Sequence, residues 1–493
     1  MKRAVSVLLS AALMLSVLTG CGKSGSVSKK NIPAEETAES KKIALSDSGI
    51  TVDGAAISDD ETAAVYAAQD IVYYEEGQGV AYGAGTDADA HSQEEADAHT
   101  VVHITQPGTY TLSGTLSAGQ ITVDLGDGAE EDPEAVVTIV LDGVDITCTV
   151  APAIIFYRVY ECGSADMETA TQTVDTSAAG ANVVIADGTE NRVTGSHVAK
   201  IYKPESVTLN ADGTAVEEAK KLHKYDGALY SKMSMNVSGG EAGTGTLEIV
   251  ADNEGLDSEL HLTINSGNIH ILAGNDGINT NEDGVSVTTI NGGTLRIEVT
   301  GETGEGDGID SNGWLVINGG TVIAAACSDS ADSGLDSDNG IYINGGIVIA
   351  SGNMYDAVDG GDQTYAVFQF AQKQSGGQTY TLKNAAGETI LEMTPENAFQ
   401  YLVVSAPGLA EGEYTLWCGD TQLGASTGSV GGPSGGMGRP DGQPPEGAPG
   451  QKPEGADDGQ QPPEPPADGQ RPEGGPRSEE RRVGKECRSR WSP

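Results

Sequence analysis

Acidic and amide side chains recur in five similar turns between residues 253 and 360, and such oxygen-rich turns could bind a hard cation. If equivalent residues stack about 4.8 Å apart, neighbouring carboxylates repel by roughly 3.5 kcal/mol at an effective dielectric near 20. We therefore predict Ca²⁺ at some of these turns, and a solvated acidic edge with splayed side chains is the alternative. The candidate ligands are Asp257, Asn275, Asp276, Asn279, Asp307, Asp310, Asp332, Asp336, Asp356 and Asp359.

A second recurrence consists of asparagines that follow an isoleucine and precede a glycine-containing corner. They stand at positions 265, 291, 318 and 344, so their spacing stays at 26 or 27 residues. Stacked amides can hydrogen-bond to one another and satisfy polar groups at a tight corner. The constant spacing predicts an amide ladder, whereas a simple preference for Asn-Gly turns would not require it.

The elements that must position these turns are short strands. Aliphatic and polar residues alternate between the turns, as in Leu295, Ile297 and Val299 pointing inward while Arg296 and Glu298 point outward. A fixed period of this length without helical patterning predicts an all-β solenoid of stacked coils, over residues 108–361.

Composition limits the possible partners. The 493 residues contain 73 Asp and Glu against 27 Lys and Arg, which gives a formal charge of −46. Such a field repels nucleic acid, so no nucleic-acid partner is expected. The start of the chain resembles a bacterial lipoprotein signal peptide over residues 1–20, with Cys21 as the lipidated residue. We expect a membrane anchor at Cys21 and a location on the extracellular face of the bacterial cell membrane.

Other segments differ in composition. Residues 21–45 form a polar spacer, and residues 46–107 form an N-terminal β region with an acidic insertion at 73–99. Residues 362–427 are strand-forming but out of period, which predicts a β cap over the last coil. The Gly/Pro-rich tail at 428–476 is expected to be disordered, and the basic end at 477–493 looks like adapter or vector sequence.

The cysteines show no metal-binding spacing. Cys148 and Cys162 are close enough in sequence to pair in an exported protein. Cys327 stands in a strand of small residues and is expected in the core.

The lipobox, the opening Gly-Thr-Tyr-Thr-Leu-Ser-Gly-Thr-Leu, the repeated Asp-Gly-Ile-Asp and the Ile-Asn-Gly-Gly-Thr corners together resemble one known family. It comprises the carbohydrate-binding-domain lipoproteins of clostridia and related gut bacteria. The resemblance covers roughly residues 50–423. It implies a right-handed parallel β-helix with calcium at its turns, similar in shape to pectate lyases, that binds polysaccharide of the cellulose or pectin class. The acidic insertion and the irregular stretch at 160–178 depart from the pattern.

Outward side chains are the candidates for binding sugar. Trp314 and Tyr342 share a parity that puts both on the outer face of one sheet, where aromatic rings could stack on sugars. Arg296 is the third candidate ligand-binding residue. It is the only Lys or Arg between residues 233 and 361, so a lyase base is hard to find there. We therefore expect a non-catalytic binding protein. A calcium-dependent polysaccharide lyase or hydrolase and a structural adhesin or spacer are the alternatives.

Overall fold

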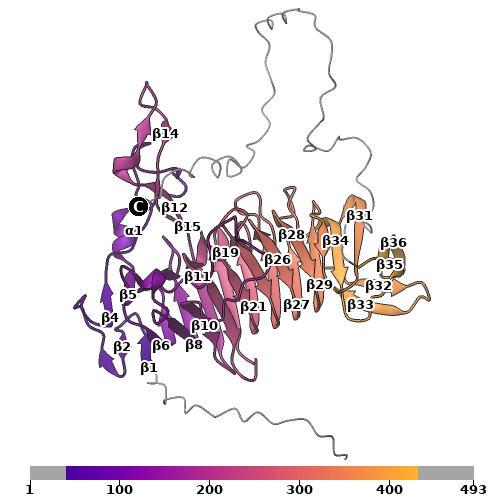
Figure 1. The fold of residues 1–493 in the computed structure, drawn as a ribbon, viewed down its shortest axis with the longest axis horizontal. Helices are drawn as coiled ribbons and strands as arrows, with labels where there is room; N and C mark the ends of the chain where they lie inside the picture. The colour runs from indigo at the N-terminus through magenta and orange to yellow at the C-terminus, as the bar shows by residue number, and fades with distance from the viewer. Residues whose placement is uncertain (1–39, 431–493) are drawn as a thin grey trace, which may run out of the picture. The chain divides into compact units, whose positions relative to one another are not determined.

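The computed structural model describes residues 40–430, and within that range the regular secondary structure consists almost entirely of β-strands (Figure 1). The helices of the described range are short: α1 (Gln93–Asp97) and the 3₁₀ helices η1 (Ala129–Glu131) and η2 (Pro204–Ser206). The all-β prediction is confirmed. The expected signal peptide, Cys21, the basic end and nearly all of the Gly/Pro-rich tail lie outside the described residues.

Three series of strands, each mainly parallel, make up most of the fold. From β17 to β27 the chain visits the three series in turn, so that each strand pairs in parallel with the strand three places later. The first series contains β1 (Ser40–Leu45), β6 (Gly108–Leu116), β8 (Val137–Thr147), β10 (Ala181–Ile185), β17 (Met235–Gly239), β20 (Leu262–Ile264), β23 (Val287–Ile290), β26 (Trp314–Ile317), β28 (Gly340–Ile343) and β30 (Val358–Gly360).

The second and third series lie on the other sides of the stack. The second begins at the far end of β8 and continues through β11 (Glu190–Gly195), β18 (Thr246–Ala251), β21 (Asn268–Ala273), β24 (Thr294–Val299), β27 (Thr321–Ala325) and β29 (Ile347–Gly352). The third consists of β4 (Val65–Ala68), which is antiparallel, and then β5 (Thr100–Ile104), β7 (Gly119–Asp124), β9 (Ile154–Arg158), β16 (Gly227–Ser231), β19 (Glu254–Ser258), β22 (Ile278–Thr280) and β25 (Ile309–Ser311).

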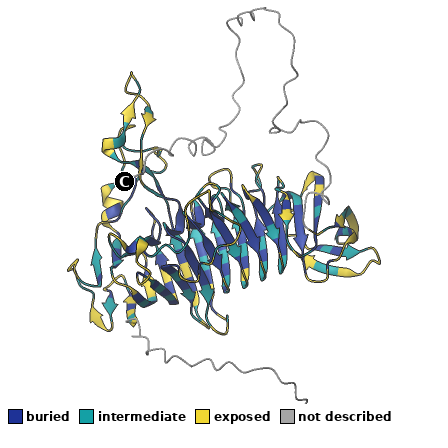
Figure 2. Ribbon diagram, in the orientation of Figure 1, coloured by how far each residue is buried: buried dark blue, intermediate teal, exposed yellow. Residues whose placement is uncertain are grey.

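Alternation within the strands fills the space between the three series. In β24, Leu295, Ile297 and Val299 are each at most 1 % exposed, while Arg296 and Glu298 lie on the outer face. Figure 2 shows the same pattern along the stack, with buried residues concentrated in the strands. The predicted inward positions are therefore confirmed, and hydrophobic burial of stacked aliphatic side chains stabilises the repeat.

Some segments differ from the expected boundaries. Residues 40–45, assigned to the spacer, form strand β1, which pairs in parallel with β6. In the part of the chain that the structure describes, Cys148 and Cys162 are both free thiols, so the suggested disulfide is wrong. Cys327 is 2 % exposed, as predicted for a core residue. None of the helices among residues 40–430 has the length and apolar character needed to cross a membrane.

Antiparallel pairing appears at the C-terminal end, so the sheets of the molecule are mixed. Strand β34 (Phe399–Ser405) pairs antiparallel with both β29 and β31 (Tyr365–Gln374) and so continues the sheet past the last repeat. A separate antiparallel sheet packs beside them, around a second hydrophobic core. It contains β32 (Tyr380–Asn384), β33 (Thr389–Met393), β35 (Gly412–Cys418) and β36 (Thr421–Gly428).

Several excursions leave the stack. Small hairpins are formed by β2 (Thr51–Val52) with β3 (Ala55–Ala56), β12 (Val198–Tyr202) with β15 (Lys221–Tyr225), and β13 (Thr208–Leu209) with β14 (Val216–Glu218). The acidic insertion contacts the start of the β12–β15 hairpin, because Oδ1 of Asp89 in the insertion lies 3.0 Å from Nε2 of His197, the residue before β12. Residues 160–178, between β9 and β10, form a long connection that we call the strap. It crosses neighbouring strands and bears on the site described next.

Candidate functional site

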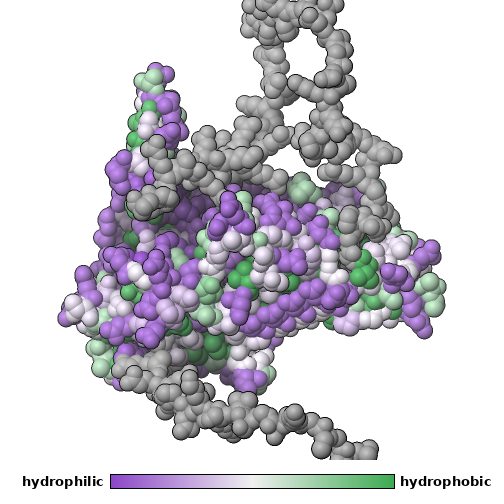
Figure 3. All heavy atoms as spheres, in the orientation of Figure 1, coloured by the Kyte–Doolittle hydropathy of each residue, from purple (hydrophilic) through white to green (hydrophobic). Residues whose placement is uncertain are grey.

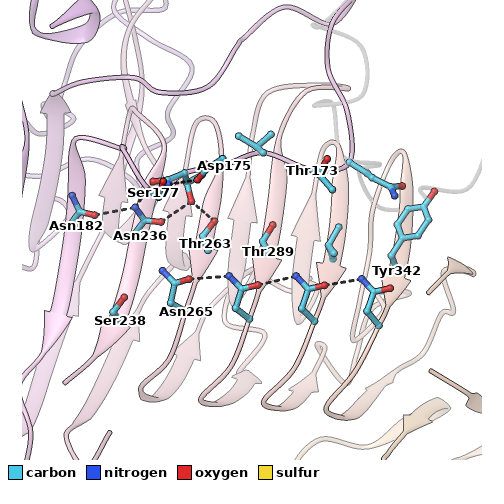
Figure 4. A pocket seen from close by; sticks show the side chains of 17 residues that line it. Thr173, Asp175, Ser177, Asn182, Asn236, Ser238, Thr263, Asn265, Thr289 and Tyr342 are labelled. Carbon is cyan, nitrogen blue, oxygen red and sulfur yellow. Dashed lines mark hydrogen bonds between the residues drawn. The ribbon is translucent and has the colours of Figure 1, made fainter. Parts of the chain in front are cut away.

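An amide ladder runs along the first series, one residue beyond the end of each strand (Figure 4). Asn291 donates from Nδ2 to Oδ1 of Asn265 at 3.0 Å, Asn318 donates to Asn291 at 2.9 Å, and Asn344 donates to Asn318 at 2.8 Å. The isoleucine before each asparagine pairs with the isoleucine of the next strand, which sets this alignment. The predicted ladder is confirmed, and all four amides are exposed.

A cleft of about 520 Å³ lies over the ladder. One wall is the outer face of the first series, which presents amides, hydroxyls, Val316 and Tyr342. The other wall consists of residues 172–177 of the strap. The face drawn in Figure 3 is mostly hydrophilic, with apolar side chains in small scattered areas. The cleft therefore offers hydrogen-bonding groups along one direction and two apolar side chains on the same wall.

Thr176 fastens the strap to the sheet. Its hydroxyl lies 2.8 Å from Asn236 Oδ1 and 2.7 Å from Thr263 Oγ1, and its carbonyl oxygen accepts from Asn236 Nδ2 at 2.7 Å. All three residues are at least nine-tenths buried. Glu161 provides a second anchor, because its carboxylate accepts from the backbone N–H of Ser234 at 2.6 Å. These bonds hold the wall of the cleft in place.

Of the predicted sugar-binding aromatics, Tyr342 lines the cleft. It lies on β28 opposite Val316 of β26, at the end of the cleft away from Asn182 (Figure 4). Trp314 lies two residues before Val316 on the same face, opposite Gly340, as the parity predicted, but it does not line the cleft. A Cβ at Gly360 would lie 2.6 Å from the Tyr342 ring, so this glycine leaves room for the ring.

Arg296 lies elsewhere. It belongs to the second series and lines a separate surface groove of about 640 Å³ together with Arg192 and Glu248. Its guanidinium forms an ion pair with Glu396, which stands between β33 and β34. The predicted sugar-binding residues therefore do not gather in one place, because Arg296 lies on the second series while Trp314 and Tyr342 lie on the first.

The acidic turns gather along the third series, and the most buried group contains Asp226, Glu254 and Asp257. One carboxylate oxygen of each lies within 4.8 Å of the others. Asp257 is 0 % exposed, and burial together with the negative charges of Glu254 and Asp226 raises its pKa well above the usual value. Lys224 Nζ lies 2.8 Å from Asp226 Oδ2 and offsets part of this charge.

The next acids in the row are Asp276 and Asp307. Burial comes first among the causes that raise their pKa values well above the usual range, and the neighbouring acids add to it: Asp310 and Asp307 act on Asp276, and Asp336 and Asp310 act on Asp307. Each also accepts one short backbone bond, from Asp307 N to Asp276 Oδ1 and from Ser333 N to Asp307 Oδ1, both at 2.6 Å. The turns thus place more carboxylates close together than the backbone N–H donors can neutralise.

Strand register aligns only part of the predicted column. Asp257 pairs with Asn279, and Asn279 pairs with Asp310. Asp336 follows through a backbone bond to Ile309 at 2.8 Å.

The fifth turn differs from this column. Its strand β30 joins the first series, so Asp359 lies beside β28 and accepts from Ile341 N at 3.1 Å. Asp356 takes the place beside Asp336 instead, and burial and that neighbour raise its pKa to about 6.

Backbone hydrogen bonds help to position two other predicted ligands. Asp332 Oδ2 accepts from Gly306 N at 2.7 Å. Asn275 contributes a backbone N–H bond to Asn253 at 3.0 Å, at the turn before Asp276.

The residues present suit a hard cation. Asp257 Oδ2 and Asn279 Oδ1 are buried and have no hydrogen-bond partner among the described residues. Buried oxygens without partners cost free energy unless something donates to them or binds them. Carboxylate and amide oxygens are the ligands that Ca²⁺ prefers. Asp257, Asn279 and the carboxylates of Asp226 and Glu254 would hold it.

Sequence reasoning did not assign Asp226 and Glu254 as ligands. Glu254 stands in the first acidic turn, at the place that Asp276 and Asp307 occupy in later turns, so the repeat itself carried the signal. Asp226 precedes Gly227, which pairs with Glu254 in the strand register. An earlier, less regular copy of the turn therefore supplies the extra carboxylate.

Comparison with known proteins adds three findings. The family described as "Carbohydrate-binding domain-containing protein" matches residues 98–366. A protein of the same description from Acetivibrio thermocellus is 31 % identical over 173 residues, which cover 35 % of this chain and 45 % of that protein. The chain thus spans less than half the length of this relative. A solved structure, "Structure of the polysaccharide lyase-like protein from C. thermocellum, Gadolinium derivative", shares 22 % identity and covers 62 % of this chain and 93 % of its own, with a TM-score of 0.34.

Proposed function

This chain belongs to the family of carbohydrate-binding domain-containing proteins, and we propose that it binds polysaccharide without cleaving it. The observation that carries the proposal is the cleft between the amide ladder and the strap. Exposed amides repeat there at the spacing of neighbouring strands, and Tyr342 lies at one end. A polymer with a regular repeat of hydroxyl groups is the kind of ligand that such a row could hydrogen-bond at several points.

We further propose that the three strand series are the faces of a right-handed parallel β-helix. The cycling order of the strands and their parallel register support one coil for each turn of the repeat. In this arrangement the amide ladder and the acidic row occupy different faces. Sugar and cation would then bind at separate places on one scaffold.

Calcium is proposed as the structural ion of the acidic row. It would neutralise the buried carboxylates and supply positive charge to Asp257 Oδ2 and Asn279 Oδ1. The ion would stabilise the turns of the third series rather than contact sugar in the cleft.

Anchoring by lipid at Cys21 and a place on the extracellular face of the cell membrane are also proposals. They rest on the sequence at residues 1–21, where a positive start and an apolar run precede Leu-Thr-Gly-Cys. Replacing Cys21 by serine would leave the protein in the soluble fraction of cells that normally hold it in the membrane fraction. Equal membrane retention of the variant would refute the anchor.

A uronate lyase is a second candidate, and one observation favours it. Lys224 lies beside the acidic row, where sequence reasoning found no cation. In a lyase, a base removes the proton next to the uronate carboxyl while the bond to the leaving oxygen breaks and a carbon–carbon double bond forms. Lys224 is paired with Asp226 as an ammonium, and an ammonium has no lone pair with which to accept that proton, so we prefer binding to cleavage.

The proposed function is tested on a glycan array, with Ca²⁺ and with chelator, on wild type and Tyr342→Ala. Polysaccharide binding that falls at least about tenfold in Tyr342→Ala supports the cleft. The matched control is Tyr202→Ala, a partly exposed tyrosine outside the cleft, which should bind as wild type does. Release of unsaturated uronate products that absorb ultraviolet light would favour the lyase, and no retention on any polysaccharide would refute both.

A further inference from the structure

We infer that the cleft over the amide ladder selects chains of neutral sugars and rejects uronate chains, with Asp175 of the strap as the discriminating residue. This inference rests on the proposed function and names the substrate class of that same site. It follows from the charge of the cleft walls, from the unused hydrogen-bonding capacity of the ladder, and from the position of Asp175.

The cleft differs from the rest of the molecule in its charge. The chain has a formal charge of −46, yet of the 17 residues that line the cleft only Asp175 is ionised at neutral pH. No Lys or Arg is among these lining residues. Recognition of a uronate carboxylate calls for Arg, Lys or a bound cation, and the cleft walls supply none of the side chains. The acidic row that suits Ca²⁺ belongs to the third series, whereas the cleft lies on the first.

The ladder has the capacity to bind hydroxyl groups. Each amide has two N–H donors and two acceptor lone pairs. Asn291 and Asn318, inside the ladder, each use one donor and one acceptor for their neighbours. One N–H and one lone pair on each of these two exposed amides are left for a ligand. A hydroxyl both donates and accepts, so it matches this pair, whereas a carboxylate can only accept.

Tyr342 and Val316 add an apolar surface on the same wall as the amides. Pyranose rings have apolar C–H faces that pack on aromatic side chains. A neutral sugar chain lying along the ladder could therefore use both its hydroxyl edges and its ring faces.

Asp175 supplies the repulsion. It is exposed and lines the cleft on the strap side, one residue before the anchor Thr176. Hydrogen bonds from Ser177 to its carboxylate, including one from the backbone N–H at 3.0 Å, lower its pKa, so it stays ionised throughout the neutral range. A like charge placed against a ligand carboxylate disfavours the wrong partner, and a carboxylate can still accept bonds from neutral hydroxyls.

The test measures affinities by calorimetry for a neutral cello-oligosaccharide and an oligogalacturonate of equal length, each with Ca²⁺ and with chelator. The variants are Asp175→Asn and, as matched control, Asp166→Asn. Asp166 lies on the same strap, is exposed, and accepts from the N–H of Glu168 at 3.0 Å in the same local pattern, but it does not line the cleft.

We expect the neutral chain to bind wild type at least about tenfold more tightly than the uronate chain in chelator. Asp175→Asn should raise uronate affinity roughly fivefold at low salt, with a smaller gain at high salt, while Asp166→Asn leaves it unchanged. Uronate binding that requires Ca²⁺ and is as strong in Tyr342→Ala as in wild type would take place outside the cleft. Such a result agrees with the inference.

Uronate binding in chelator that equals neutral binding and falls in Tyr342→Ala would overturn the inference while sustaining the proposed function. An Asp175→Asn variant that folds and gains no uronate affinity would also overturn it. If neither oligosaccharide binds wild type, the proposed function itself fails.

Discussion

Removing divalent cations should destabilise this protein at neutral pH and much less at mildly acidic pH. Without a cation, Asp257, Asp276, Asp307 and Asp356 crowd negative charge along one row, and their pKa values are raised by burial and by one another. A raised pKa means that the folded state holds its protons to higher pH than the unfolded state does. Stability of the cation-free protein therefore falls as pH rises from about 4 through 6 and beyond.

The magnitude can be set from Asp356 and from ion binding. A pKa raised from 3.8 to about 6 corresponds to about 3 kcal/mol, and discounting for the partial exposure of Asp356 leaves about 1.5 kcal/mol. One ion at a hundred times its dissociation constant adds about 2.7 kcal/mol. Because the entropy of unfolding is about 2.1 cal/mol/K per residue, this corresponds to a rise in Tm of only about 3 °C for a protein of this size.

The assay is thermal unfolding between pH 4.5 and 7.5, in chelator and in millimolar Ca²⁺. This window lies above the range in which Asp47, Asp60 and Asp187, whose pKa values are lowered by hydrogen bonds, lose their stabilising effect. We expect Tm in chelator to fall as pH rises, and Ca²⁺ to raise Tm most at pH 7.5. Protons compete with the metal for carboxylates, so the effect of calcium should shrink at pH 4.5.

The variant Asp257→Asn removes the negative charge of this side chain while keeping its size and shape. In chelator at pH 7.5 this variant should melt higher than wild type, because it removes a buried charge, and it should respond less to Ca²⁺. Asp166→Asn, on the exposed strap, should behave as wild type in both conditions. A wild-type Tm that is the same with and without chelator at every pH would refute the reasoning about the acidic row.

Three further predictions concern the cleft. Asn318→Ala removes one amide and its two hydrogen bonds from the ladder, so it should lower the free energy of unfolding by about 1 kcal/mol for each lost bond. The affinity for a neutral oligosaccharide should fall about tenfold, and unchanged affinity by calorimetry would contradict a role in binding. Gly360→Ala should displace the Tyr342 ring and weaken binding as Tyr342→Ala does, and normal binding would show that the ring position is immaterial. Thr176→Val should lower the free energy of unfolding by about 1 to 3 kcal/mol, because it leaves Asn236 Oδ1 buried without this hydrogen-bond donor. Proteolysis within the strap should become faster. Equal cleavage rates in the variant and wild type would show that Thr176 does not hold the strap.

The repeat allowed much of this architecture to be predicted from the sequence. Because the spacing between equivalent residues is nearly constant, the register of Asn265 with Asn291 and the inward position of Ile297 follow from counting along the chain. The acidic row was readable for the same reason, since Asp276 and Asp307 recur at the same turn. Local periodicity determines these contacts, so local pattern predicts them.

The contacts that sequence reasoning missed join segments with no periodic relation. Arg296 pairs with Glu396, a hundred positions later and outside the repeat. The strap lacks strand alternation, and nothing in its sequence indicates that Thr176 reaches Asn236. Asp359 leaves the column because its strand joins a different series near the end of the stack, where no further repeat holds the register.

The two chemistries of the molecule are connected through the repeat that generates both. Each turn contributes an amide to one series of strands and an acid to another, so the spacing of the amide rungs depends on the same stacking that crowds the carboxylates. A cation on the third series would hold that stacking without touching the cleft. Chelation should therefore weaken neutral-sugar binding only at temperatures where the turns begin to open, and leave it intact well below the melting transition. Loss of sugar binding on chelation at low temperature, with the fold unchanged, would instead mean that the ion contacts the ligand.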